Sequence, residues 1–120
     1  MTEPKNPDKY PIDDFAKLDL RVGLIKKAEK HPNADKLLVL TVDFNNSIPN
    51  PERTIVAGLA PYYKPKELEN KKAIFIINLQ PATLRGIESN GMILAASTED
   101  KSKVIFLTPE KDLPVGSKVY

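Results

Sequence analysis

Short runs of alternating apolar and polar residues dominate this chain. The clearest run is LLVLTVDF at residues 37–44, where every second position is apolar. Successive side chains of a strand point to opposite faces, so the run predicts a strand with one apolar face. The residues on that face are Leu38, Leu40, Val42 and Phe44.

Several other short runs have strand character. They lie at residues 20–31, 53–60, 72–80, 92–98 and 103–110, and the segment 114–120 closes the chain. Helical signals occur only between these runs. Residues 12–19 fit a short helix with acidic residues near its start, and Pro65 suits the first turn of another. Gly23 is a candidate for a bend or bulge in the first long strand.

Short strands with helical pieces only at the connections predict an all-β fold, a small β-barrel. A five-stranded barrel has room for a first strand that bends at Gly23. Periodicity alone does not distinguish this barrel from a small sandwich. Residues 1–11 hold three prolines among polar residues and are expected to form a flexible lead-in, with residues 12–120 as one domain.

Composition excludes several kinds of chemistry. The 120 residues include no cysteine, so no thiolate metal site and no Cys–His pair can form. The one histidine, His31, lies in a turn, where an exposed ring is more often structural than catalytic. We therefore expect no catalytic residue, no metal and no cofactor. No apolar run approaches the roughly 20 residues of a membrane span, and we expect a cytoplasmic protein without membrane contact.

The net charge of +2, from 18 basic and 16 acidic residues, is modest. A protein that holds nucleic acid by charge alone is usually more strongly basic. A polyanionic partner would therefore require the positive charge to be gathered on one face.

One stretch carries more chemistry than a connection between strands requires. Residues 78–97, NLQPATLRGIESNGMILAAS, follow an apolar strand and place a guanidinium, hydroxyl and amide groups and a thioether along a glycine-containing bend. A bend needs only turn residues. This mixture predicts a surface that touches a polar, flat partner.

Three separated segments resemble, in the same order, the tRNA-binding domain family. They are HPNADKLLVL (31–40), IVAGLAPYY (55–63) and the 78–97 stretch. Members include free-standing bacterial tRNA-binding proteins and the C-terminal appendage of many methionyl-tRNA synthetases. The resemblance implies a five-stranded OB-fold barrel with a C-terminal strand-rich extension. It also implies a homodimer that recognises the L-shape of tRNA largely independently of the anticodon.

The resemblance places RNA-binding residues at Lys36, Asn78, Arg85, Ser89 and Met92. A lysine can meet a phosphate as a point charge, and an arginine can also fork onto two phosphate oxygens. The amide and hydroxyl can bond ribose hydroxyls, and the thioether can pack on a base. Two alternatives stay open: Asn78 could instead satisfy loop backbone, and Met92 could belong to the core.

We therefore expect a non-catalytic module that binds tRNA, either free-standing or assisting a methionyl-tRNA synthetase. Val104, Phe106 and Val119 are expected at the dimer interface, or else close the monomer's own barrel. The alternative function is a dimeric peptide-binding export chaperone of the same fold, which usually lacks the LRGIESNGM signature.

Overall fold

The computed structural model describes residues 8–120, which form short strands joined by tight loops and short helical turns. The elements are α1 (Ile12–Ala16), β1 (Leu20–Lys30), β2 (Leu38–Asp43), the 3₁₀ turn η1 (Asn45–Ser47), β3 (Glu52–Ala57), α2 (Pro65–Leu68), β4 (Lys72–Ile76), β5 (Ala82–Leu84), β6 (Ile87–Ser89), β7 (Met92–Ile93), β8 (Ala95–Ser97), β9 (Val104–Phe106) and β10 (Lys118–Val119). Residues 1–7 of the expected lead-in lie outside the described residues.

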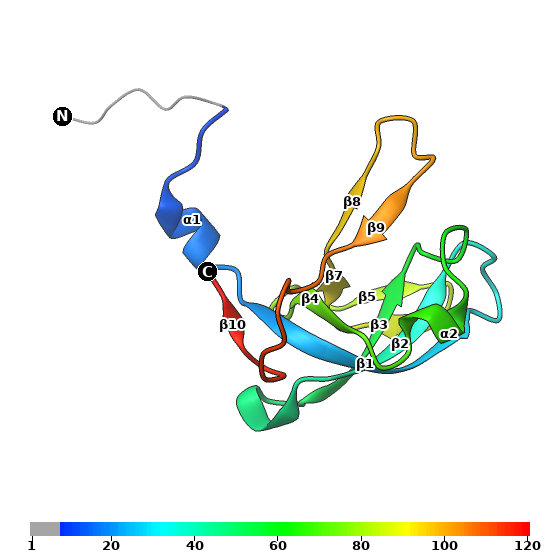
Figure 1. Cartoon of the computed structure of the whole chain (residues 1–120), viewed down its shortest axis with the longest axis horizontal. Coiled ribbons are helices and arrows are strands. Elements are labelled where there is room, and N and C mark those ends of the chain that lie inside the picture. The colour runs from blue at the N-terminus through cyan, green and yellow to red at the C-terminus, as the bar shows by residue number, and fades with distance from the viewer. Residues whose placement is uncertain (1–7) are drawn as a thin grey trace.

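The main sheet is built around β1, which pairs antiparallel with three strands. Its first half pairs with β4 and β10, and its second half pairs with β2. The sheet follows the order β3–β2–β1–β4–β7 (Figure 1). The Asn90 N–H donates to the Thr54 carbonyl at 2.8 Å, which draws the chain before β7 against β3. The result is a nearly closed, barrel-like sheet, which confirms the predicted all-β fold with short helices at connections.

Three parts of the strand prediction are wrong. Residues 92–98 form β7 and β8, which belong to different sheets. The chain turns between them at Leu94, whose N–H donates to Ile74 while its carbonyl accepts from Leu107. The expected bend at 82–89 is a hairpin of β5 and β6. The register shift in β1 also lies between Ile25 and Lys27 rather than at Gly23.

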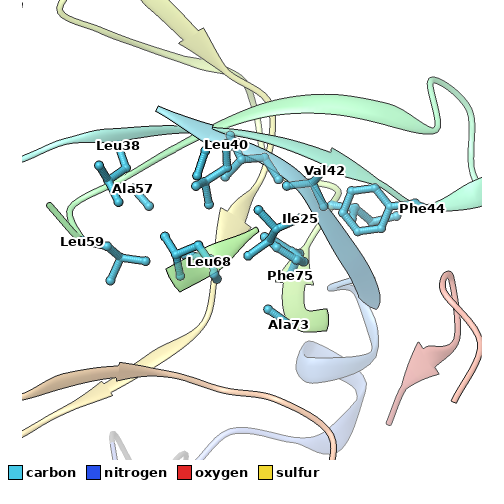
Figure 2. Packing of buried hydrophobic residues seen from close by; sticks show 14 of the residues in the cluster. Ile25, Leu38, Leu40, Val42, Phe44, Ala57, Leu59, Leu68, Ala73 and Phe75 are labelled. Carbon is cyan, nitrogen blue, oxygen red and sulfur yellow. The ribbon is translucent and has the colours of Figure 1, made fainter. Parts of the chain in front are cut away.

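The core confirms the apolar face predicted at residues 38–44, because all four of its side chains are fully buried (Figure 2). The rings of Phe44 and Phe75 meet edge to face, 5.5 Å apart at 84°. Gly23 lies over this pair. A Cβ at residue 23 would lie 2.7 Å from Phe44 and Val42 and 2.9 Å from Phe75. Close packing of β1 on the rings therefore requires glycine.

Two features lie outside the barrel. The β8–β9 hairpin projects from it, while α1 and β10 lie together at one end of the molecule (Figure 1). No residue of α1 is buried. No helix within residues 8–120 has the length and apolar character needed to cross a membrane.

We predict that Gly23→Ala lowers the free energy of unfolding by about 1–3 kcal/mol, because the added methyl group overpacks the rings of the core. Urea denaturation measures this loss. Gly58→Ala is the matched control, since a Cβ there meets nothing within 4 Å. Its effect should stay within about 1 kcal/mol. Equal losses in the two variants would contradict the packing role of Gly23.

Candidate nucleic-acid interface

His31 joins the two segments that carry the predicted cations. The Asn33 N–H donates to its Nδ1 at 3.0 Å, so the ring proton lies on Nε2, which donates to the Leu84 carbonyl at 2.9 Å. The ring is buried, with 5% of its surface exposed. The expectation of an exposed imidazole is therefore wrong, whereas its structural role is confirmed. The bond fixes the β5–β6 hairpin against the loop that contains Lys36.

Arg85 occupies the tip of that hairpin in an unusual backbone conformation. Arg85 and Gly86 have φ values of +52° and +91°. Two consecutive positive φ values in a two-residue loop are typical of a type I′ turn, which favours Asn-Gly. An arginine at the first position costs conformational energy that asparagine would largely avoid. The geometry of the turn therefore does not explain this choice of residue.

Lys36 and Arg85 are both exposed, and neither side chain makes an ion pair or hydrogen bond within residues 8–120. Other cations of the first strand are engaged. Arg21 donates to Asp19 at 2.8 Å. Lys26 pairs with Glu52, whose hydrogen bond and charge raise the pKa of Lys26. Lys36 and Arg85 are thus available to an anionic partner.

Ser89 has an internal role in this structure. Its side chain is buried, with 5% exposure. The hydroxyl accepts from the Val56 N–H at 2.9 Å and donates to the Gly91 carbonyl at 3.2 Å. These bonds tie β6 to β3, and the group already has a donor and an acceptor partner inside the protein. The Ser89 hydroxyl is therefore engaged within the protein.

Asn78 does not lie beside Lys36 and Arg85. Its side-chain oxygen accepts from the Asp19 N–H, and its amide group donates to the Lys17 carbonyl, both at 2.7 Å. These bonds hold the chain just before β1, whereas Lys36 follows the far end of that strand. The residue is exposed, yet its amide satisfies loop backbone, which was the alternative stated for it.

Met92 begins β7 opposite Ile76 and is 49% exposed, so it is a surface residue and not part of the core. Its side chain lines a hollow of about 240 Å³ together with Gly58 and Ala95. The segment that contains Gly58 also reaches the first cation, because the Ala60 N–H donates to the Lys36 carbonyl at 3.3 Å. Met92 therefore lies at a hollow whose lining includes Gly58, two residues before the Ala60 N–H that bonds the Lys36 carbonyl.

Comparison with known families decides the assignment. The family model described as "Putative tRNA binding domain" matches residues 20–118. The chain belongs to this family. Among relatives, the methionine–tRNA ligase of Pyrococcus horikoshii is 50% identical over 117 residues. That match covers 98% of this chain but only 15% of the ligase, so the tRNA-binding domain corresponds to a small part of such enzymes.

Solved structures agree with this placement of the tRNA-binding domain. A MetRS-related protein from Pyrococcus horikoshii superposes with a TM-score of 0.85 at 46% identity, covering 93% of this chain and 98% of that one. A CsaA chaperone protein from Picrophilus torridus gives a TM-score of 0.82 at 31% identity, covering 93% and 100%. The domain thus shares its fold with proteins named for two different activities.

Sequence reasoning missed the positioning role of His31. Ile25 and Ala28 are both buried although they lie three residues apart, because the register shift in β1 interrupts the alternation between them. His31 follows the end of the strand, so the alternation does not predict its burial. The available signal was the HPN turn itself. In such a turn the His31 side chain can accept a hydrogen bond from the backbone N–H two residues later, as Asn and Asp side chains often do.

We predict that His31→Phe destabilises the domain by about 1–3 kcal/mol, because the Leu84 carbonyl and the Asn33 N–H both lose a partner. Hydrogen exchange should show faster exchange of the Asn33 amide. Lys30→Ala changes a neighbouring exposed residue and should alter stability by no more than about 0.5 kcal/mol. Unchanged exchange at Asn33 in His31→Phe would refute the role assigned to the ring.

Proposed function

We propose that this domain is a non-catalytic tRNA-binding module. The observation that carries the proposal is the pair of exposed, unpaired cations, Lys36 and Arg85, on two segments joined by His31. Membership of the tRNA-binding family supports the identity of the ligand. Met92 extends the surface with an adaptable apolar contact.

The surface suits recognition of the tRNA backbone and overall shape. Lys36 and Arg85 can contact phosphates, which position a protein but carry no sequence information. We therefore infer recognition of the L-shaped fold, largely independent of the anticodon. Asn78 would contact RNA only where the ligand extends along the full length of β1.

The relatives suggest how such a module is used. Joined or docked to a methionyl-tRNA synthetase, it would raise the local concentration of tRNA and leave catalysis to the enzyme. A free-standing role is equally compatible with the surface. Either role places its action in the cytoplasm, where tRNA is charged.

A second candidate function is polypeptide binding. The 31% identity to a chaperone of the same fold and the apolar hollow beside Met92 both favour it. The two unpaired cations favour RNA instead. Competition between labelled tRNA and an unfolded polypeptide distinguishes the candidates, because the polypeptide would displace the tRNA only from a chaperone.

We also propose a homodimer formed through α1 and β10. A hollow of about 270 Å³ between them is lined mainly by apolar side chains, and Ile12 and Tyr120 at its rim are 76% and 93% exposed. Within residues 8–120, β10 pairs only with β1, so its other edge is open to a second copy. Val119 lines this hollow, whereas Val104 and Phe106 pack on the monomer's own core.

We predict that Lys36→Ala and Arg85→Asn each weaken tRNA binding. Each lost phosphate contact should flatten the log–log dependence of affinity on salt by about 0.7–0.9. Arg85→Asn should at the same time preserve or raise stability, because asparagine is favoured at this turn position. Filter binding of folded tRNA across a salt series, with thermal unfolding in parallel, measures both effects.

The control for this series is Lys111→Ala, which removes an exposed lysine from the segment between β9 and β10. This variant should leave the log–log dependence of tRNA affinity on salt nearly unchanged. Denatured tRNA and duplex DNA are tested beside folded tRNA. Equal retention of all three would indicate generic charge attraction, and unchanged binding in both variants would remove the site assignment.

We predict that the unchanged chain sediments as a dimer at micromolar concentration and that Ile12→Asp shifts it to a monomer, because the added carboxylate must be desolvated in the apolar interface. Ile105→Asp is the matched control, since Ile105 is a 56% exposed apolar residue on the projecting hairpin. It should remain dimeric. A monomeric unchanged chain in sedimentation equilibrium would defeat the dimer proposal.

A further inference from the structure

Gly58 is a glycine that the fold itself does not require. Gly86, Gly91 and Gly116 have positive φ values, and Gly23 is held against the core rings. Gly58 has neither constraint: its φ is not in the positive range, and a Cβ built on it meets nothing within 4 Å. An alanine would fit here, and the glycine leaves the space above the residue open.

That space is part of an elongated trough. The hollow beside Met92, which Gly58 lines, shares Val104 with a second hollow of about 290 Å³. The second hollow lies between Tyr62 and Lys103. The Gly58 trough therefore runs from Met92 past Gly58 and Val104 to Tyr62 and Lys103.

The lining of the Gly58 trough is apolar with one positive charge. Lys103 is the only charged residue in the lining of the two hollows, and no carboxylate lines them. Tyr62 and Met92 offer an aromatic ring and a thioether at opposite ends. An unstacked base can pack on an aromatic ring or a thioether, and its phosphate can bind a cation. A glycine lets a ligand approach the backbone closely.

One wall of the trough is rigid although it projects into solvent. In the 98–103 loop, Asp100 accepts from the Ser102 N–H at 3.0 Å and from the Thr98 and Ser102 hydroxyls at 2.8 Å. These bonds lower the pKa of Asp100 to about 2, with the Ser102 N–H as the largest cause. The Tyr62 hydroxyl donates to the Lys101 carbonyl at 2.9 Å. A wall fixed before binding reduces the entropy lost when a ligand binds.

The segment 58–60 links the trough to Lys36, because Gly58 lines the trough and the Ala60 N–H donates to the Lys36 carbonyl. We propose that the Gly58 trough receives an unpaired, unstacked nucleotide of the bound tRNA, with the base over Gly58 and Tyr62 and the phosphate at Lys103. This inference rests on the proposed function and specifies which part of the RNA is held. An extended polypeptide fits the shape of the trough, but its neutral backbone leaves Lys103 without a partner.

The test compares Gly58→Ala, Gly58→Val and Gly58→Phe in the full chain. Filter binding is measured with folded tRNA, a short single-stranded RNA and a blunt RNA duplex. Affinity for tRNA and single strand should fall progressively with side-chain size. For Gly58→Phe the loss should be about tenfold to a hundredfold, the range measured for losing one base stack. Duplex binding should stay unchanged, because a duplex offers no unstacked nucleotide.

A second pair of variants gives a test that does not depend on the fold of Gly58→Phe. Tyr62→Leu should weaken single-strand binding more than Tyr62→Phe does, because Tyr62→Phe keeps the ring and loses only the hydroxyl bond to the Lys101 carbonyl. Lys103→Ala should weaken single-strand binding more than Lys111→Ala does. Thermal unfolding of each variant separates loss of binding from loss of fold.

The outcomes separate the inference from the function it rests on. Normal tRNA and single-strand binding in both Gly58→Phe and Tyr62→Leu would overturn the trough assignment and leave the tRNA-binding function intact. An unchanged chain that binds no tRNA would overturn both. Displacement of single strand by an unfolded polypeptide, abolished in Gly58→Phe, would assign the trough to polypeptide and overturn the inference.

Discussion

The passage of β1 over the paired rings of Phe44 and Phe75 is the constraint on which the rest of the structure depends. Only a residue without a side chain fits at position 23, since any Cβ there would overlap the rings. Because β1 can pass so closely, its first half pairs with β4 and β10 while its second half continues along β2. The strand ends at Lys30, and the next residue is His31. The strand that passes so closely over the rings thus leads directly to the histidine that bonds the hairpin carrying Arg85.

Hydrogen bonds attach the cation surface to this barrel. His31 bonds the Leu84 carbonyl, and the Ala60 N–H bonds the Lys36 carbonyl. Neither bond uses the Lys36 or Arg85 side chain, so these two side chains can be changed without removing either bond. The backbone strain at Arg85 is a local cost in stability, of the kind that proteins tolerate at functional positions.

Sequence reasoning succeeded where one local rule acted alone. The alternation at 38–44 identified four core residues, and Pro65 marked the start of α2. It failed where tertiary context decided the outcome. The β5–β6 turn carries Arg in place of the expected Asn, so its hairpin signal was hidden. The sequence suggested that the Ser89 hydroxyl lies on the surface, because its partner, the Val56 N–H, is 33 residues away in the chain. The resemblance supplied Lys36 and Arg85, which no periodicity could have singled out.

The two proposed interfaces lie at opposite ends of β1. The strand has 11 residues, so its ends are separated by up to about 33 Å, less any curvature. Dimerisation through α1 and β10 would therefore leave both cation surfaces uncovered and directed away from the interface. With a net charge of only +2 per chain, one surface offers a weak electrostatic attraction, and two surfaces held in a fixed relation would act together on one large ligand. Rigid spacing of two modest sites is a means of recognising the shape of a folded RNA without reading its sequence. It also explains why a module with so little net charge can belong to a family that binds a polyanion.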